Sequence, residues 1–328
     1  MIKNAIAGIV LCCACVSSFG QTGGGATVAL PITPAHAWAD PTHAMLLDAA
    51  HAGARLVAVG EHGIMLLSDD GGRTYRQAKQ VPASTTLSSV YFSDAQHGWA
   101  VGQWGVILAT TDGGETWALQ RSDTSIDQPL FTVYFQDAQH GWAAGLWSLL
   151  LKTDDGGRTW AVVKLPAPPG GGKSDRNLYR IFADRAGTLF IAAEKGTVLR
   201  SRDRGATWEY RETGNKGSLW AGTAATDGAL FVGGLLGHLY RSRDGGDTWT
   251  SIDSGASGSI TSLIAAGGRV LGVGLEGFVI SGTGGDERFT AKQRMDRAAL
   301  TALIVPDTAK ESASQPLLLS KGGVLKAE

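Results

Sequence analysis

"TDDGGRTW", residues 153–160, decides the fold because four close relatives of this stretch occur elsewhere in the chain. A catalytic centre is needed once, whereas a residue set that recurs at a regular period is typical of a repeating structural unit. All five stretches fit the pattern Ser/Thr-x-Asp-x-Gly-x-Thr-aromatic and start 41 to 48 residues apart; the other four are SDDGGRTY from Ser68, TTDGGETW from Thr110, SRDRGATW from Ser201 and SRDGGDTW from Ser242.

The chemistry of the box favours a structural turn over catalysis. Asp155 can accept backbone N–H groups across a turn, and Gly156 and Gly157 can adopt conformations that other residues resist. The acids lack the alternating spacing and the distal glutamate of a calcium loop, so we expect no metal site, no other cofactor and no catalytic residue here. The aspartates with this expected structural role are Asp70, Asp112, Asp155, Asp203 and Asp244.

Around each box lies a longer unit of four short apolar runs separated by turn residues, as in residues 87–120, LSSVYFSDAQHGWAVGQWGVILATTDGGETWALQ. Runs of this length and spacing predict antiparallel strands. The pattern Gly-x-x-Gly before the third run, as in GQWG (102–105), predicts a tight turn with positive φ. Together the markers indicate seven repeats, which start near residues 45, 87, 130, 178, 219, 260 and 300.

Seven such units predict an all-β chain folded as a seven-bladed β-propeller of four-stranded antiparallel blades. Stacking the blades in a ring buries faces that a single sheet would expose. The seventh repeat has only three of the four apolar runs. We therefore expect the extended stretch ATVALPITPAHAW (26–38) to complete the last blade as its outer strand, within a single domain over residues 21–328.

The beginning of the chain predicts export. Residues 1–20 have the early charge, apolar run and small residues of a secretory signal peptide, so we expect a periplasmic or secreted protein. All three cysteines lie in this segment, which leaves no disulfide in the mature chain. No later apolar stretch is long enough for a membrane-spanning helix. A net charge of −1 gives no sign of a nucleic-acid surface.

The boxes resemble the Asp-boxes, or bacterial neuraminidase repeats. The longer patterns DAQHGWAVGQWGVILATTDGGETW (94–117) and LVAVGEHGIMLLSDDGGRTY (56–75) are similar, more specifically, to the photosystem II stability/assembly factor-like propeller family. This resemblance implies a seven-bladed propeller, exported or lumenal, that acts by protein contact without catalysis. Many members occur in bacteria with no photosystem, so the resemblance carries no photosynthetic role to this chain, which we expect to be a non-photosynthetic bacterial member.

Two functions therefore remain open. The first is a monomeric, non-catalytic propeller that binds a protein partner as an assembly, stability or accessory factor in the cell envelope, with an envelope transporter as one candidate partner. The alternative is a carbohydrate-active propeller, either a sialidase-like glycoside hydrolase or a glycan-binding module. A hydrolase would need two acids about 5–9.5 Å apart in one pocket. The nearest match to a sialidase arginine motif, LYRIFA (178–183), lacks the proline and lies in the fourth repeat.

The Gly-x-x-Gly tips hold the candidate partner-binding residues. Trp104 and Trp147 occupy tips of adjacent repeats. The equivalent residue elsewhere is His62, Lys195, Leu236 or Glu276, so the repeat itself does not require tryptophan there. Exposed aromatic residues near one another indicate an interface. In the other interpretation, each ring packs on the loop of the neighbouring blade. The full candidate set is Trp104, Trp147, Glu61, His62, Lys195 and, on a loop between blades, Arg176.

Overall fold

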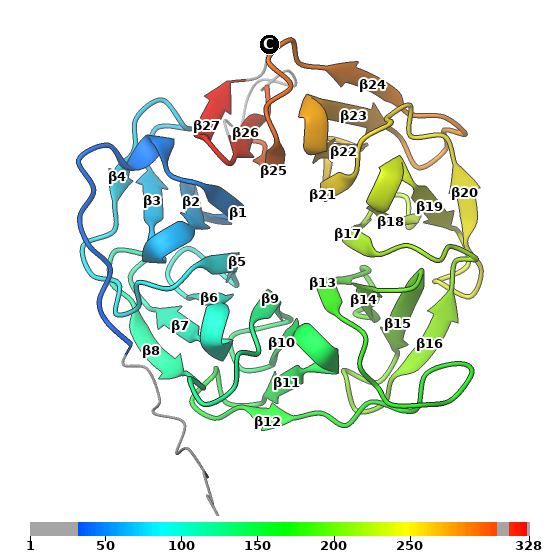
Figure 1. Cartoon of the computed structure of the whole chain (residues 1–328), viewed down its shortest axis with the longest axis horizontal. Helices are drawn as coiled ribbons and strands as arrows, with labels where there is room; N and C mark the ends of the chain where they lie inside the picture. The colour runs from blue at the N-terminus through cyan, green and yellow to red at the C-terminus, as the bar shows by residue number, and fades with distance from the viewer. Residues whose placement is uncertain (1–31, 307–314, 327–328) are drawn as a thin grey trace, which may run out of the picture.

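The computed structural model describes residues 32–306 and 315–326. In these residues, seven antiparallel sheets surround a central channel as the blades of a β-propeller (Figure 1). Six sheets have four strands and the seventh has three, and each sheet is built from one contiguous stretch of chain. The prediction of a seven-bladed, antiparallel propeller is confirmed. No helix of the described residues is long and apolar enough to span a membrane.

We number the blades 1 to 7 in chain order. The innermost strands line the channel: β1 (Leu46–Ala52), β5 (Leu87–Phe92), β9 (Leu130–Phe135), β13 (Leu178–Ala183), β17 (Leu219–Ala224), β21 (Ile260–Ala266) and β25 (Leu300–Ile304). The second strands are β2 (Arg55–Gly60), β6 (Gly98–Gly102), β10 (Gly141–Gly145), β14 (Leu189–Ala193), β18 (Leu230–Gly234), β22 (Arg269–Gly274) and β26 (Leu317–Ser320). The third strands are β3 (Met65–Ser68), β7 (Ile107–Thr110), β11 (Leu150–Thr153), β15 (Thr197–Ser201), β19 (Leu239–Ser242), β23 (Phe278–Gly282) and β27 (Gly323–Lys326). The outer strands of the first six blades are β4 (Arg76–Gln77), β8 (Ala118–Arg121), β12 (Ala161–Val162), β16 (Glu209–Glu212), β20 (Thr250–Ile252) and β24 (Thr290–Gln293).

The strand register defines two faces of the ring. Leu46 at the start of β1 pairs with Gly60 at the end of β2, so the Gly-x-x-Gly turn lies at the end where the chain enters the blade. We call this end the upper face; it is turned toward the viewer in Figure 1. The Asp-boxes follow the third strands and lie on the opposite, lower face. The upper face carries the 3₁₀ turns η1 (Pro41–His43), η2 (Glu61–Gly63), η3 (Gln103–Gly105), η4 (Leu146–Ser148), η5 (Leu235–Gly237) and η6 (Leu275–Gly277).

The tips have the positive φ angles that the sequence pattern predicts. The second residue of each turn has a left-handed backbone, with φ of 50° at His62 and 52° at Trp147. The glycine that follows is left-handed as well, with φ of 72° at Gly63. Ser148 occupies this glycine position in blade 3 and still has φ of 59°. Side chains other than glycine resist this conformation, so blade 3 keeps a strained residue at its tip.

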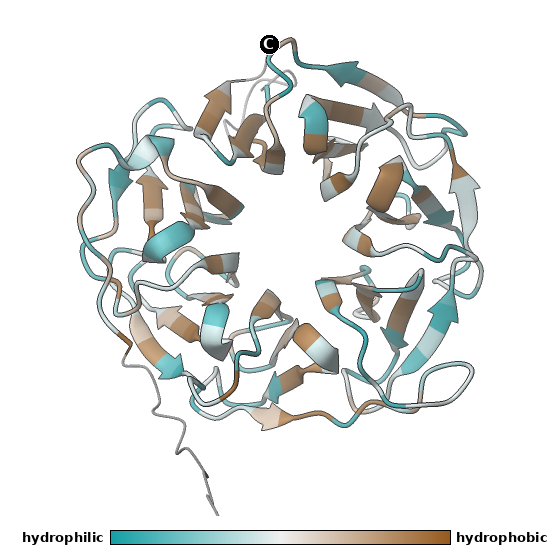
Figure 2. Ribbon diagram, in the orientation of Figure 1, coloured by the Kyte–Doolittle hydropathy of each residue, from teal (hydrophilic) through white to brown (hydrophobic). Residues whose placement is uncertain are grey.

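The hydrophobic core lies between neighbouring blades. Figure 2 shows hydrophobic residues concentrated on the inner strands and hydrophilic residues on much of the rim. Val57 and Leu67 of blade 1 pack in one cluster with Val90 and Trp117 of blade 2. Each sheet therefore depends on its neighbour to bury its face, as expected of a repeat ring.

The Asp-box is a closed hydrogen-bonded turn. In blade 3 the Thr153 hydroxyl donates to Asp155 Oδ1 over 2.8 Å and accepts the N–H of Gly157. Asp155 also accepts the backbone N–H and the hydroxyl of Thr159. The other four boxes repeat the hydroxyl bonds, which involve Asp70, Asp112, Asp203 and Asp244. In the structure these aspartates accept hydrogen bonds within the turn between the third and outer strands.

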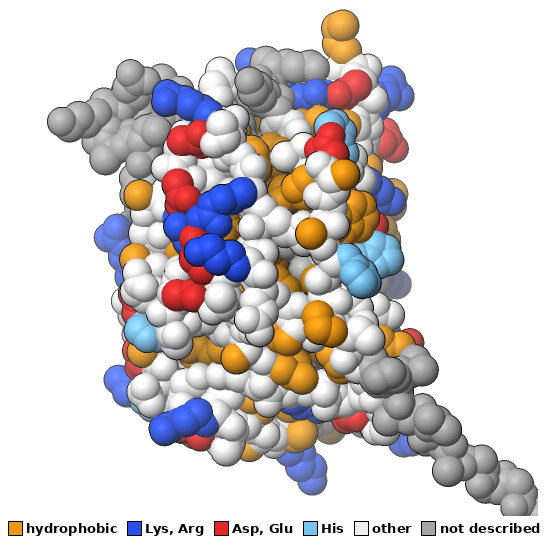
Figure 3. Space-filling view, turned by 90° about the vertical axis from the view of Figure 1, so that its left-hand side faces the viewer, with side chains coloured by type: hydrophobic (Ala, Val, Ile, Leu, Met, Phe, Trp, Pro, Cys, Tyr) orange, Lys and Arg blue, Asp and Glu red, His pale blue; other side chains and the backbone are white. Residues whose placement is uncertain are grey.

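The boxes also join the blades. The carbonyl of the first glycine in the box pair accepts a side-chain N–H from the preceding blade: Arg55 donates to Gly113 over 3.0 Å, and Arg200 donates to Gly245. Arg55 also pairs with Asp69. Figure 3 views the rim from the side of blade 1, where basic and acidic side chains alternate near the lower face. The glycines of the box therefore serve both the turn and the contact between blades.

We predicted that residues 26–38 complete the last blade as its outer strand. This prediction is wrong for the part of the segment that the structure describes. Residues 26–31 lie outside the described residues, and residues 32–38 form no strand with blade 7. They run instead along blade 1, where Ala35 N–H donates to Val81 O and Ser84 N–H donates to Thr33 O. Ile32 and Ala35 add apolar contacts to the core between blades 1 and 2. This core is the physical reason for the position, because the segment buries its apolar residues there.

Packing, rather than a shared strand, joins blade 7 to blade 1 in the described residues. Leu46 and Leu66 of blade 1 pack with Ala302 and Leu319 of blade 7. The Thr301 hydroxyl donates to Leu46 O over 2.6 Å, and His51 Nε2 lies 2.9 Å from Val305 O. The contact between the last and first blades therefore resembles the other blade interfaces.

Candidate functional site

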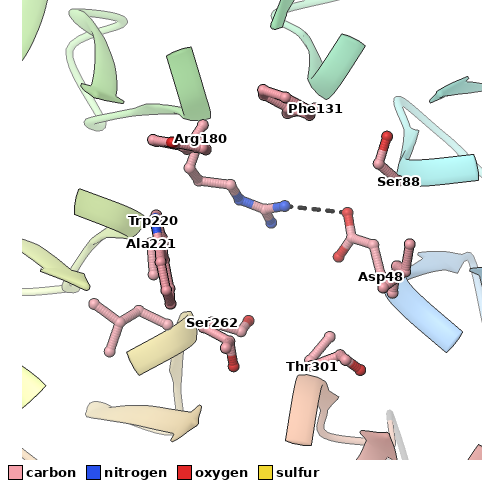
Figure 4. Close-up of a pocket in the computed structure, with 13 residues that line it drawn as sticks. Asp48, Ser88, Phe131, Arg180, Trp220, Ala221, Ser262 and Thr301 are labelled. Carbon is pink, nitrogen blue, oxygen red and sulfur yellow. Dashed lines mark hydrogen bonds and ion pairs between the residues drawn. The ribbon is translucent and has the colours of Figure 1, made fainter. Parts of the chain in front are cut away.

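The upper mouth of the central channel holds a pocket of about 190 Å³ (Figure 4). The second residue of each innermost strand lines it, so seven equivalent positions of the repeat surround one space. These residues are Leu47, Ser88, Phe131, Tyr179, Trp220, Thr261 and Thr301. Because the strands are equivalent, differences between these side chains give the mouth its chemistry.

One side of the mouth is aromatic. Phe131, Tyr179 and Trp220 come from blades 3, 4 and 5 in succession. The rings of Phe131 and Tyr179 stack, with centroids 5.6 Å apart and an angle of 16° between planes. All three side chains are half-buried, so they present ring surface to the pocket while packing on the blades. We call these three residues the aromatic crescent.

The other side carries hydroxyls that are already hydrogen-bonded. Ser88 donates to Leu130 O over 2.6 Å, and Thr261 donates to Leu300 O over 3.0 Å. Each hydroxyl thereby links its blade to the next around the ring. Since the protons are committed to the backbone, these groups offer a ligand acceptor positions only.

An ion pair crosses the channel below the crescent. Arg180 Nη1 donates to Asp48 Oδ2 over 3.1 Å, as the dashed line in Figure 4 shows. Asp48 is 8% exposed and Oδ2 also accepts from the Ser89 hydroxyl and the Val90 N–H. Arg180 is 33% exposed, so part of its guanidinium faces the pocket. Asp48 is the single acid among the described residues that line this pocket.

A second pocket of about 300 Å³ lies along the lower part of the channel and shares Arg180 with the first. Tyr91 and Tyr134 line it and make an edge-to-face contact with centroids 5.1 Å apart. Burial raises the pKa of both phenols above the usual value, which keeps them neutral. The ion pair of Asp48 and Arg180 therefore separates two pockets with aromatic walls.

The two candidate tryptophans differ in their environments. Trp104 is half-buried and packs against the core between blades 1 and 2, which supports the packing interpretation for this residue. Trp147 is 56% exposed at the tip of blade 3. No ring contact joins them within the described part of the chain. Of the two rings, Trp147 is therefore the more available to a partner.

The other candidates are also spread around the ring. Glu61 uses Oε1 to accept the Met45 N–H over 2.8 Å, which is a structural contact. His62 and Lys195 are exposed at the tips of blades 1 and 4. Arg176 is buried, and its guanidinium lies over the Tyr210 ring, 5.2 Å from the centroid. The structure thus places Arg176 inside a loop rather than on the open surface.

Three further apolar residues, outside the predicted binding set, are exposed on the upper face. Ile126, Leu236 and Met295 are 50%, 68% and 93% exposed. Together with Trp147 we call them the upper apolar residues; they lie on tips or on connections between blades. Figure 2 shows η5, which contains Leu236, as hydrophobic, whereas η2 at the equivalent tip of blade 1 is hydrophilic. The pair of leucines in GLLG (234–237) was the available sequence signal.

No group of three metal-binding side chains occurs within the described residues. His97 and His140, which are equivalent in blades 2 and 3, each contact an aspartate of their own turn. Their Nδ1 atoms lie 2.9 Å from Asp94 Oδ2 and Asp137 Oδ2. Both histidines therefore help to hold lower-face turns.

A family profile described as photosynthesis system II assembly factor YCF48 matches residues 76–233 and 122–303. These overlapping matches cover more than half of the chain. The chain belongs to the YCF48 family. A search of curated proteins finds no match.

Solved structures of YCF48 have the same fold. A structure described as YCF48 bound to D1 peptide superposes with a TM-score of 0.66 at 19% identity, covering 90% of this chain and 98% of the other. YCF48 from Cyanidioschyzon merolae gives 0.66 at 18% identity, with 87% and 95% covered. At these identities the likeness concerns the fold.

Propellers with enzyme names are similar as well. Virginiamycin B lyase from Staphylococcus aureus gives a TM-score of 0.70 at 11% identity, covering 90% of this chain and 97% of the other. An ancestral GH74 enzyme gives 0.68 at 13% identity, covering 87% of this chain and 45% of the enzyme. Since one propeller fold hosts these different proteins, function has to be argued from the site.

Proposed function

We propose that this YCF48-family propeller is an exported assembly or accessory factor that binds a protein partner with its upper face and acts without catalysis. The observation that carries the proposal is the position of the upper apolar residues. Ile126, Trp147, Leu236 and Met295 are exposed on loops of one face, around a channel mouth with an aromatic crescent. Together with the aromatic mouth that they surround, these exposed apolar groups favour the upper face as the binding surface.

The family supports a polypeptide as the ligand, because one of its structures is described as YCF48 bound to D1 peptide. The apolar tips can contact the body of a partner, while the crescent can receive a side chain that projects into the mouth. Aromatic anchors in partly enclosed pockets contribute most of the binding free energy in many interfaces. The expected signal peptide supports an envelope partner, of which a transporter is one candidate.

Capture of partners from envelope extracts of the source organism tests the proposal. Trp147→Ala combined with Leu236→Ser should reduce capture more than tenfold, since each anchor contributes about 1–2 kcal/mol or more. Val162→Ser is a matched control because Val162 is 72% exposed but lies on the outer strand of blade 3. Equal loss in both variants, or no loss in the double variant, would contradict a role of the upper face.

The carbohydrate-active alternative has one supporting observation, because stacked rings such as Phe131 and Tyr179 can also contact sugar faces. For a hydrolase, the mouth supplies a single acid, Asp48, among its described lining residues, where paired carboxylates are required. A glycan-binding role would give saturable binding to isolated envelope glycans that Trp220→Ala abolishes. Such a result would favour this alternative over the protein partner.

A further inference from the structure

Arg180 presents uncommitted N–H groups to the pocket at the channel mouth. Among the described residues, the bond from Nη1 to Asp48 Oδ2 is the only hydrogen bond that its guanidinium makes. The guanidinium projects into the open centre of the pocket (Figure 4), and the side chain is 33% exposed. Nε and Nη2 carry further N–H groups. These groups can therefore donate to a ligand.

Asp48 does not use up the positive charge of Arg180. Its Oδ1 accepts the Ala49 N–H over 3.0 Å. Its Oδ2 accepts from the Ser89 hydroxyl and the Val90 N–H as well as from Arg180. The negative charge of the carboxylate is thus shared among four donors, of which Arg180 is one. The same bond holds the guanidinium in place, which reduces the entropy that it would lose on binding a second group.

Two further donors line the same pocket. The Trp220 indole N–H and the Ser262 hydroxyl come from blades 5 and 6, and neither has a hydrogen-bond partner in the part of the chain that the structure describes. Both side chains are half-buried. Figure 4 shows them around the open space into which Arg180 projects. Ser262 differs in this respect from Ser88 and Thr261, whose hydroxyls donate to the backbone.

The aromatic crescent supplies an apolar surface beside these donors. The stacked rings of Phe131 and Tyr179 form one part of it, and Trp220 offers both a ring face and an N–H donor. The volume of about 190 Å³ is smaller than that of pockets for drug-sized molecules, so the mouth suits one ring with a short polar group. Apolar surface and uncommitted donors therefore meet in one small pocket.

We propose that the channel mouth binds a carboxylate that is attached to a single apolar ring. Arg180, Trp220 and Ser262 donate to the carboxylate oxygens, since guanidinium, indole and hydroxyl groups are donors that a carboxylate accepts. The aromatic crescent contacts the ring. The carrier is either a free small acid or the end of a polypeptide chain. The inference goes beyond the proposed partner binding, because it assigns a ligand to the mouth whether or not the upper apolar residues bind a protein.

Isothermal titration calorimetry of the full chain tests this site with hydrocinnamate, N-acetylphenylalanine and N-acetylphenylalanine amide. The amide keeps the ring but replaces the carboxylate by a neutral group. We expect saturable binding of at least one of the two acids, and binding of the amide that is weaker by about tenfold or more, because charge-assisted hydrogen bonds are lost. Binding of hydrocinnamate would identify a free acid as a ligand. Binding of N-acetylphenylalanine alone would identify a chain end.

Arg180→Met should weaken binding of the acids by about tenfold or more. Arg185→Met is the matched control, because Arg185 is exposed on the lower face of blade 4 and should keep wild-type affinity. Trp220→Phe provides a second variant in case Arg180→Met folds poorly; it keeps a ring, removes the N–H and should weaken binding severalfold. The double variant Trp147→Ala and Leu236→Ser should bind the acids like the wild type, which separates this site from partner capture.

Three results would overturn the proposal. They are the absence of saturable binding for both acids, an amide that binds as tightly as the acids, and wild-type affinity for the acids in both Arg180→Met and Trp220→Phe.

Discussion

Arg180 on the innermost strand of blade 4 donates across the channel to Asp48 on the innermost strand of blade 1, with an Nη1–Oδ2 distance of 3.1 Å. The two residues lie 132 positions apart in the chain and join blades that do not touch through their core clusters. Asp48 also receives two donors from blade 2, so one carboxylate links three blades.

Asp48→Ala should lower the free energy of unfolding by about 2–4 kcal/mol, because Ser89, Val90 and Arg180 would lose their acceptor in a largely buried position. Arg180→Met should cost about 1 kcal/mol or less, since Arg180 is one-third exposed and Asp48 keeps its other donors. Urea denaturation of both variants measures the difference. A larger cost for Arg180→Met would show that the ion pair, rather than the donors from blade 2, accounts for the stability.

Thr153→Val should destabilise the protein by about 1–3 kcal/mol, because the Gly157 N–H loses its acceptor in a buried turn. The change preserves side-chain shape, so packing is little affected. Thr250→Val on an exposed outer-strand position serves as control and should stay within about 0.5 kcal/mol of wild type. Partner capture should be unchanged in both; its loss at an unchanged Tm would contradict the structural role of the box.

Acid should destabilise the fold between about pH 4 and pH 2. Hydrogen bonds from the threonine hydroxyls of the boxes lower the pKa of Asp155, Asp203 and Asp244 to about 2. Since an unfolded aspartate has a pKa of about 3.9, this stabilisation is complete above that value and is lost as the pH falls through the native pKa. Tm measured from pH 7 to pH 2 should fall in this window.

Asp203→Asn combined with Asp244→Asn tests the assignment. The variant should be less stable at pH 7, because an amide offers one acceptor oxygen in place of two, and its Tm should fall less steeply in acid. A slope equal to that of the wild type would assign the acid sensitivity to other carboxylates.

Trp147→Asn should leave the free energy of unfolding unchanged or raise it. Asparagine adopts the left-handed backbone more readily than tryptophan, and the exposed indole loses little packing. Trp104→Asn should be less stable, because this indole packs on the core, and Trp117→Ala should lose about 3–5 kcal/mol from a buried site. Thermal unfolding of the three variants gives the order; an early transition for Trp147→Asn would make Trp147 a packing residue.

The features that the sequence predicted are those that every repeat must satisfy. Strand positions, the left-handed tip residues and the aspartate turn recur because each blade needs them, and a periodic pattern is visible in one sequence. The aspartate turn is visible in the sequence because all its bonds lie within seven residues, from Thr153 to Thr159.

Features that depend on contacts with one particular neighbouring segment were not predictable from the repeat pattern. Trp104 and Trp147 occupy equivalent tips, but Ala78 and Ala83 of the preceding blade belong to the cluster against which Trp104 packs. The adjacent loop therefore determines how exposed a tip side chain is, and the sequence of this loop differs from blade to blade. The predicted position of residues 32–38 was wrong for a related reason. The backbone of an extended apolar segment can form its hydrogen bonds at more than one place around the ring. Arg180 stood out only as part of a poor sialidase match.

Each sheet uses one contiguous stretch of chain, so a rearrangement of the gene that keeps these stretches intact also keeps the sheets intact. A cut between any two blades would leave all sheets whole, because no described strand is exchanged between distant parts of the chain. The positions where the chain begins and ends could therefore be moved around the circle, and a blade could be duplicated or deleted as a unit without tearing its neighbours. The order of the blades can therefore change without changing how each sheet forms. The residues at the tips of the upper face can be exchanged one blade at a time.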